Sequence, residues 1–167
     1  MPSFFFRGRY ADYARELNTK ISKEYNPIFS TYVSIYMISA SYGSIYGKFK
    51  EYDPEKDAIE TTPAEVREEY FVSRPDYPVF RKIILISERQ SKSNATERID
   101  NALRYDIPIN RSTPENLAKM SKYEENTKII DGCALGGLEL LYDKFKKLKD
   151  AEDIILEMEK IKKELEI

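Results

Sequence analysis

Apolar side chains recur at three- and four-residue steps along much of the chain, which is the spacing of one face of an α-helix. One such stripe predicts a helix over residues 10–25. Another series begins at Pro114 and continues, with a break, to Leu148. The pattern predicts an all-α fold, a single-domain helical bundle with a long or broken C-terminal helix. We expect residues 1–150 to form the helical domain. Residues 151–167 would form a last helix, within that domain or as an association element.

The segment Ile28–Gly47 contains no charged residue. It is long enough to span a bilayer. However, it is rich in Ser and Tyr, whose hydroxyl groups are costly in lipid unless they are paired. We therefore expect a buried helix at the centre of a bundle. Such a helix packs against neighbours on all sides and so needs no charged face.

Two helix starts are indicated by side chains that cap free backbone N–H groups. Thr62–Pro63 places a cap before a proline, which predicts a helix that ends near Ser73. Asn94, followed by Glu97 three residues later, predicts a second helix that ends near Tyr105.

The segment Val79–Ile86 is ambiguous, because its four consecutive apolar residues from Ile83 would also suit a buried strand. No second convincing strand is available to pair with it. Since a lone strand leaves backbone groups unsatisfied, we expect a helix.

Small residues stand four positions apart in two places. Ser39, Gly43 and Gly47 form one series, and Gly132 and Gly136 form another. Small residues at this spacing give a helix a flat face on which another backbone can approach closely. A phosphate-binding loop is the alternative, but no Gly-Lys-Ser/Thr follows. We expect Gly43 and Gly136 each to lie where the backbone of another helix passes.

The residues that most often carry enzyme chemistry are scarce. The 167-residue chain has no histidine and one cysteine, Cys133, which excludes a Ser-His-Asp or Cys-His arrangement and an internal disulfide. Cys133 lies among apolar neighbours, so we expect a buried, unreactive thiol. The acidic run from Glu51 to Glu69 lacks calcium-loop spacing and predicts a solvated surface. We expect a cytoplasmic protein with no catalytic, metal-binding or cofactor-binding residues.

The net charge of −2 is unevenly distributed. Several cations stand near aromatic residues, a combination with which proteins hold phosphates and stack on bases. The candidate nucleic-acid contacts are Arg7, Arg9, Arg81, Lys82, Arg98 and Arg104, with Arg89 and Lys92 between them. The lysines between Lys144 and Lys149 lie at the end of a predicted helix, where cations favour the helix dipole.

An apolar stripe near the C-terminus is a candidate association surface. It consists of Leu148, Ile155, Met158, Ile161 and Leu165. A helix of this kind is marginal alone and must bury its stripe. Residues 151–167 are net negative and residues 81–150 net positive, so we expect the helix to dock on a second copy or a partner protein.

Three stretches resemble small accessory proteins encoded beside bacterial DNA-phosphorothioation (Dnd-type) defence systems. They are Phe6–Tyr13, Glu97–Arg104 and Gly136–Tyr142. The resemblance implies a helical helper that works with larger enzymes in DNA modification or restriction. It implies no catalytic residues.

Together these features predict a non-enzymatic helical accessory or adaptor protein, acting in a bacterial DNA-modification or anti-phage defence complex. Direct nucleic-acid binding through the cations above is the alternative. A hydrolase that uses paired carboxylates or tyrosines is less supported, because no carboxylate pair stands in an apolar setting. We expect a protein partner or a homo-oligomer, with DNA as a further candidate ligand, and no membrane or cofactor.

Overall fold

The computed structural model describes residues 3–19, 27–89, 93–106, 114–148 and 150–165, with the backbone alone at 72 and 114–118. Helices dominate this part of the chain, and the all-α prediction is confirmed with one small two-stranded sheet added. The elements are β1 (Phe4–Phe6), α1 (Arg9–Asn18), α2 (Tyr32–Ile45), α3 (Pro54–Asp57), β2 (Ala64–Val66), α4 (Glu68–Val72), α5 (Tyr77–Ser87), α6 (Ala95–Arg104), α7 (Pro114–Phe145) and α8 (Ala151–Leu165).

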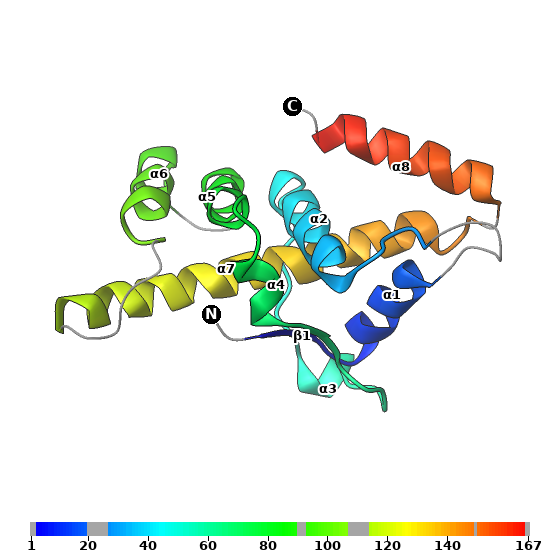
Figure 1. Cartoon of the computed structure of the whole chain (residues 1–167), viewed down its shortest axis with the longest axis horizontal. Helices are drawn as coiled ribbons and strands as arrows, with labels where there is room; N and C mark the ends of the chain where they lie inside the picture. Colours follow the sequence, from blue (N-terminus) through cyan, green and yellow to red (C-terminus); the bar gives the residue numbers. More distant parts are fainter. Residues whose placement is uncertain (1–2, 20–26, 90–92, 107–113, 149, 166–167) are drawn as a thin grey trace.

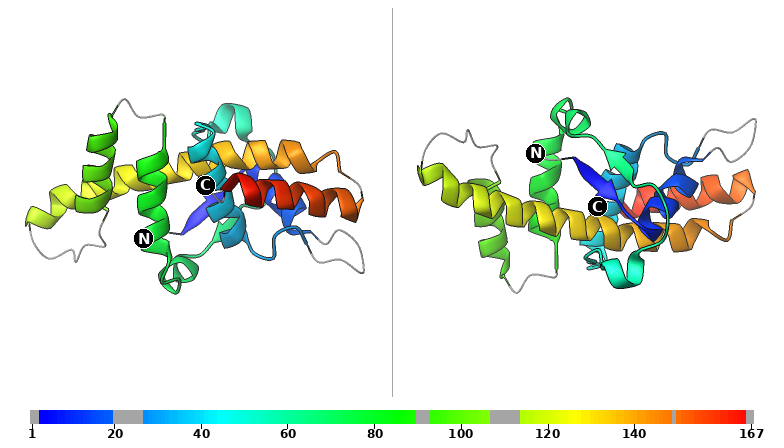
Figure 2. Two further views of the ribbon diagram at one scale, coloured as in Figure 1. Left: turned by 90° about the horizontal axis from the view of Figure 1, so that it is seen from above. Right: turned by 90° about the horizontal axis from the view of Figure 1, so that it is seen from below.

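Helix α7 runs the length of the molecule, and the other elements pack around it (Figure 1). It is continuous from Pro114 to Phe145, so the break expected within this helix is absent, and α8 is a separate helix. Helices α2, α5 and α6 stand beside one another across α7, and α8 returns over α2 (Figure 2). The most extensive contact in the fold is that between α2 and α7.

The charge-free segment forms α2, as predicted, and much of it is buried. Thr31 caps its start, because the Thr31 hydroxyl accepts a hydrogen bond from the Ser34 N–H at 3.2 Å. Ile35, Tyr36 and Ala40 are fully buried. In the part of the chain that the structure describes, no helix has the length and apolar character needed to cross a membrane.

Glycines allow α2 and α7 to cross at backbone contact. A Cβ at Gly43 would overlap the Cys133 carbonyl oxygen of α7. A Cβ at Gly137 would overlap the Ser39 carbonyl oxygen and lie 2.6 Å from the Gly43 nitrogen. The prediction of close helix packing at Gly43 is therefore confirmed.

The prediction for Gly136 is wrong in its partner. A Cβ there would lie 2.5 Å from the Lys48 carbonyl oxygen, which belongs to the segment after α2 and not to a helix. That segment reaches α7 because Gly47, at a positive φ of 61°, ends α2. The Lys48 N–H then donates to the Gly43 carbonyl at 2.7 Å, a common helix-ending bond.

The helix predicted to begin at Thr62–Pro63 is wrong. Residues Ala64–Val66 form β2, which pairs antiparallel with β1 and places Phe6 opposite Ala64. Burial alternates along β2, with Glu65 exposed between two buried side chains, and this is the period of a strand. The strand pairing satisfies the backbone N–H and C=O groups of Ala64–Val66. These residues therefore do not form the helix that Thr62–Pro63 would cap. Helix α4 begins only at Glu68.

The remaining helix predictions are confirmed with adjusted ends. Helix α1 ends at Asn18, and residues 20–26 lie outside the described part of the chain. The ambiguous segment Val79–Ile86 lies within α5. At the start of α6, the Asn94 side chain accepts from the Glu97 N–H and the Glu97 carboxylate accepts from the Asn94 N–H, which completes the predicted capping box.

A buried pair between α2 and α7 makes stability depend on pH. The Tyr36 hydroxyl donates to Asp131 Oδ1 at 2.7 Å. Burial raises the pKa of Asp131 from 3.8 to about 6, although the Tyr36 hydrogen bond acts in the opposite direction. The folded state therefore binds this proton more tightly than the unfolded state does. Its stabilising contribution is complete below about pH 4 and is lost as the pH rises through about 6.

Asp131→Asn should remove this dependence, since the amide stays neutral and keeps an acceptor for Tyr36. We expect the variant to gain about 1–2 kcal/mol over the parent between pH 4 and pH 7, because one pKa unit corresponds to about 1.4 kcal/mol and some solvent reaches the site. Urea unfolding of both proteins at the two pH values measures this gain. A difference that does not change with pH would contradict the assignment.

Candidate binding groove

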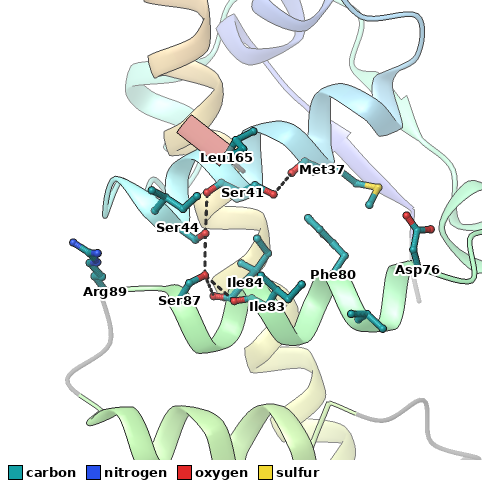
Figure 3. Close-up of a pocket in the computed structure, with 12 residues that line it drawn as sticks. Met37, Ser41, Ser44, Asp76, Phe80, Ile83, Ile84, Ser87, Arg89 and Leu165 are labelled. Atoms are coloured by element: carbon teal, nitrogen blue, oxygen red, sulfur yellow. Dashed lines mark hydrogen bonds between the residues drawn. The ribbon is translucent and has the colours of Figure 1, made fainter. Parts of the chain in front are cut away.

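A groove of about 630 Å³ lies between α2 and α5, and Leu165 of α8 contributes to its wall (Figure 3). On α2 it is lined by Met37, Ser41 and Ile45, which recur every four residues and so share one helix face. On α5 the four-residue series Val79, Ile83 and Ser87 lines the opposite wall. The groove is therefore built by two facing helix stripes.

The α5 wall is apolar and open to solvent. Val79 and Ile83 are each 57% exposed, and they stand one turn apart. Phe80 and Ile84 lie beside them and lead into the interior. Adjacent exposed apolar side chains that border a concave surface are typical of binding sites.

The uncharged polar side chains of the groove are hydroxyls that already donate their protons within the fold. Ser41 Oγ donates to the Met37 carbonyl at 3.0 Å, and Ser44 Oγ donates to the Ser41 carbonyl at 2.9 Å. Ser87 Oγ lies 2.7 Å from the Ile83 carbonyl and 3.3 Å from Ser44 Oγ. The oxygens remain available as acceptors, so the groove can hold an apolar ligand with a few donors.

Two opposite charges mark the ends of the α5 wall. Asp76 precedes α5, and Arg74 lowers its pKa through a hydrogen bond, with a separation of 3.2 Å. Arg89 follows α5, is exposed, and has no ion pair with any described residue. A ligand that lies along α5 therefore meets a negative group at one end and a positive group at the other.

Arg81, a predicted nucleic-acid contact, is instead part of the core. Its side chain is 2% exposed and contacts Asp106 through two nitrogens, Nε at 2.8 Å and Nη2 at 2.6 Å. Nη2 also donates to Thr127 at 3.2 Å, and the guanidinium lies 4.2 Å from the centre of the Tyr123 ring. Since burial removes Arg81 from the surface, its prediction as a phosphate contact is wrong.

Two other predicted cations form ion pairs within the fold. Arg9 forms ion pairs with Asp57 and Glu139, each at 2.8 Å. Arg104 pairs with Asp100 at 2.6 Å.

Arg98 donates to the carbonyls of Ile86 and Ser93. Lys82 is half-buried, and Arg7 is exposed beside the Phe5 ring. The predicted set does not gather on one face, because β1 and α6 lie on different sides of α7 (Figure 1).

The predicted association stripe is largely covered by its own chain. Ile161 is buried, and Leu148, Met158 and Leu165 are partly buried against the core. Only Ile155 is half exposed. The expectation that this stripe is free for a partner is therefore wrong, because α8 docks on α2 and α7.

Polar contacts hold α8 in this position. Lys144 of α7 pairs with Glu157 at 3.0 Å and lies 3.8 Å from Glu164. The Tyr42 hydroxyl of α2 donates to Glu164 at 2.6 Å. Lys144, predicted to act on the helix dipole, is thus part of a cluster that joins three helices.

A reactive cysteine and a metal site are two features that the described part of the molecule can test. Cys133 is buried as predicted, and burial raises the pKa of its thiol to about 12, so the nucleophilic thiolate is scarce at neutral pH. Among the described residues no three Cys, Asp or Glu side chains are placed to hold a metal ion.

Comparison with known proteins adds no information about the groove. No protein-family model, curated protein or solved structure matches the chain.

Proposed function

We propose that this protein is a non-enzymatic helical adaptor that binds a helix of a protein partner in the groove between α2 and α5. The observation that carries the proposal is the pair of solvent-exposed side chains, Val79 and Ile83, on the wall of a groove of about 630 Å³. Burial of one such side chain contributes about 1.5–3 kcal/mol when it is complete. Each is already about half covered, so a partner gains roughly half of that from each.

The dimensions of the groove fit a helix. Its α5 wall extends from Asp76 to Ser87, which at 1.5 Å per residue is about 16 Å, or three turns. Two facing stripes with four-residue spacing can hold the apolar face of an amphipathic helix, a common mode of peptide recognition. The resemblance to Dnd-type accessory proteins supports a role beside the larger enzymes of DNA modification or restriction.

Photo-crosslinking from the groove tests the proposal. A photoreactive amino acid replaces Ile83, and a matched protein carries it at Lys128, an exposed position on α7. Both are produced in cells together with the products of neighbouring genes. We expect one defined protein to be joined to position 83 and not to position 128. The proposal fails if position 83 crosslinks to no protein, or to the same mixture as position 128.

A further inference from the structure

We propose that the helix received by the groove is α5 of a second copy of this chain, packed antiparallel about a two-fold axis near Ile83. The inference rests on the proposed function, and it names the partner. Helix α5 is at once a wall of the groove and an apolar ridge, since Val79 and Ile83 project from it. In a two-fold dimer each copy presents the same surface, so the ridge of one copy enters the groove of the other.

The charges at the ends of α5 select the direction of the second helix. Asp76 stands before α5 and Arg89 after it, so the two are nearly equidistant from Ile83 along the chain. In an antiparallel pair, Asp76 of each copy faces the partner's Arg89, and two attractive contacts form. A parallel pair would place like charges against one another at both ends, which opposes association.

Contacts within one copy compete little with the proposed ion pairs between Asp76 and the partner's Arg89. Arg74 lies 3.2 Å from Asp76, but both side chains are at least 40% exposed, and exposed pairs of this kind contribute little. Arg89 has no ion pair with any described residue. Asp76 can therefore exchange its partner at little cost, and Arg89 gains one.

The other cations of α5 do not oppose the packing. Arg81 is buried against Asp106. Lys82 lies about 100° around the helix from Ile83, whereas the groove lies on the opposite side, towards Phe80 and Ile84.

Three turns of helix alone cover less than a stable interface of about 1,200–2,000 Å² in total. Met37 and Ile45 of α2 and Leu165 of α8 enlarge the contact, because they line the groove that receives the second α5.

Solution mass tests the inference, with charge reversal as the diagnostic change. Sedimentation equilibrium of the full chain, over a range of about 1–100 µM, is expected to show a monomer–dimer equilibrium. Asp76→Arg and Arg89→Asp should each raise the dissociation constant on the order of tenfold, because each disturbs both end contacts. The protein with both changes should return to within about threefold of the parent, since the attraction is restored with its sign reversed.

Ile83→Glu serves as the apolar test, and Lys128→Asp as the control outside the groove. Circular dichroism and thermal melts confirm that every variant is folded. The expected result is a monomeric Ile83→Glu variant and a control with the parent's dissociation constant. The inference is overturned by a parent that stays monomeric, by a dimer that Ile83→Glu leaves intact, or by single reversals that the double change does not rescue.

The crosslinking experiment distinguishes failure of the dimer inference from failure of the proposed adaptor function. A monomeric protein joined at position 83 to a different protein overturns the dimer and leaves the adaptor function standing. A monomeric protein with no crosslink at that position overturns both.

Discussion

Gly137→Ala is expected to lower the free energy of unfolding by about 3 kcal/mol, among the largest effects of any single methyl group in this protein. The added Cβ would overlap the Ser39 carbonyl and approach the Gly43 nitrogen, both backbone atoms of α2. Backbone atoms of a packed helix cannot move aside without displacing α2 from α7. Alanine gains about 1 kcal/mol over glycine in helix propensity, which is too little to offset the overlap.

Gly132→Ala is the matched control, because it makes the same change five residues earlier in α7. Its Cβ would meet the ring of Phe49, a half-buried side chain, whereas the Cβ at position 137 meets backbone atoms. We expect a loss of no more than about 1 kcal/mol for this variant. Equal losses for the two variants in urea unfolding would contradict the assignment of Gly137 to the helix crossing.

Asp106→Ala is expected to destabilise the protein by about 3–5 kcal/mol, since it leaves the guanidinium of Arg81 buried without its counter-ion. Asp100→Ala is the matched control. It removes the same type of side chain from an exposed pair with Arg104, for which we expect a loss of about 0–1 kcal/mol. Chemical denaturation of both variants gives the comparison.

A second change distinguishes loss of charge balance from loss of packing. Replacing both partners, with Arg81→Met and Asp106→Leu, removes the buried charges and keeps apolar volume. We expect this double variant to recover most of the stability lost by Asp106→Ala. A double variant as unstable as Asp106→Ala would mean that the contacts of Arg81 with Thr127 and Tyr123 dominate.

The sequence was most informative where a local pattern had a steric cause. The spacing of Gly43 with Ser39 predicted a close backbone approach, because glycine in a helix is unfavourable unless packing requires it. The same logic failed for Gly136, since spacing shows that a backbone can approach but not which one does. The approach of Lys48 depends on the turn at Gly47.

Long-range partners account for the other errors. Thr62–Pro63 has the chemistry of a helix start, yet β1, about sixty residues earlier, provides a strand partner for Ala64–Val66. Arg81 has the composition of a surface cation, and nothing near it in the chain reveals Asp106, 25 residues away, as its buried counter-ion. Tertiary pairing overrides local preference in both cases.

The groove was missed because the exposure of an apolar residue cannot be read from its identity. Val79 and Ile83 belong to a segment whose apolar run also suited a buried strand, and the preference for a helix did not reveal which of its side chains would be exposed. The sequence instead indicated α8 as the association element, because its stripe is more regular. Helix α8 folds onto α2 through Tyr42 and onto α7 through Lys144, which covers most of that stripe and leaves α5 open.

The central claim is that the α5 face of the groove becomes covered by a protein helix. An environment-sensitive dye on Ile83→Cys measures this directly, because Cys133 is buried and does not compete for the label. Lys128→Cys carries the same dye as the control. We predict that emission from position 83 shifts to shorter wavelength as unlabelled parent protein, or the partner identified by crosslinking, is added, while the control does not change. Water-like emission from position 83 in a sample whose mass shows association would contradict the claim.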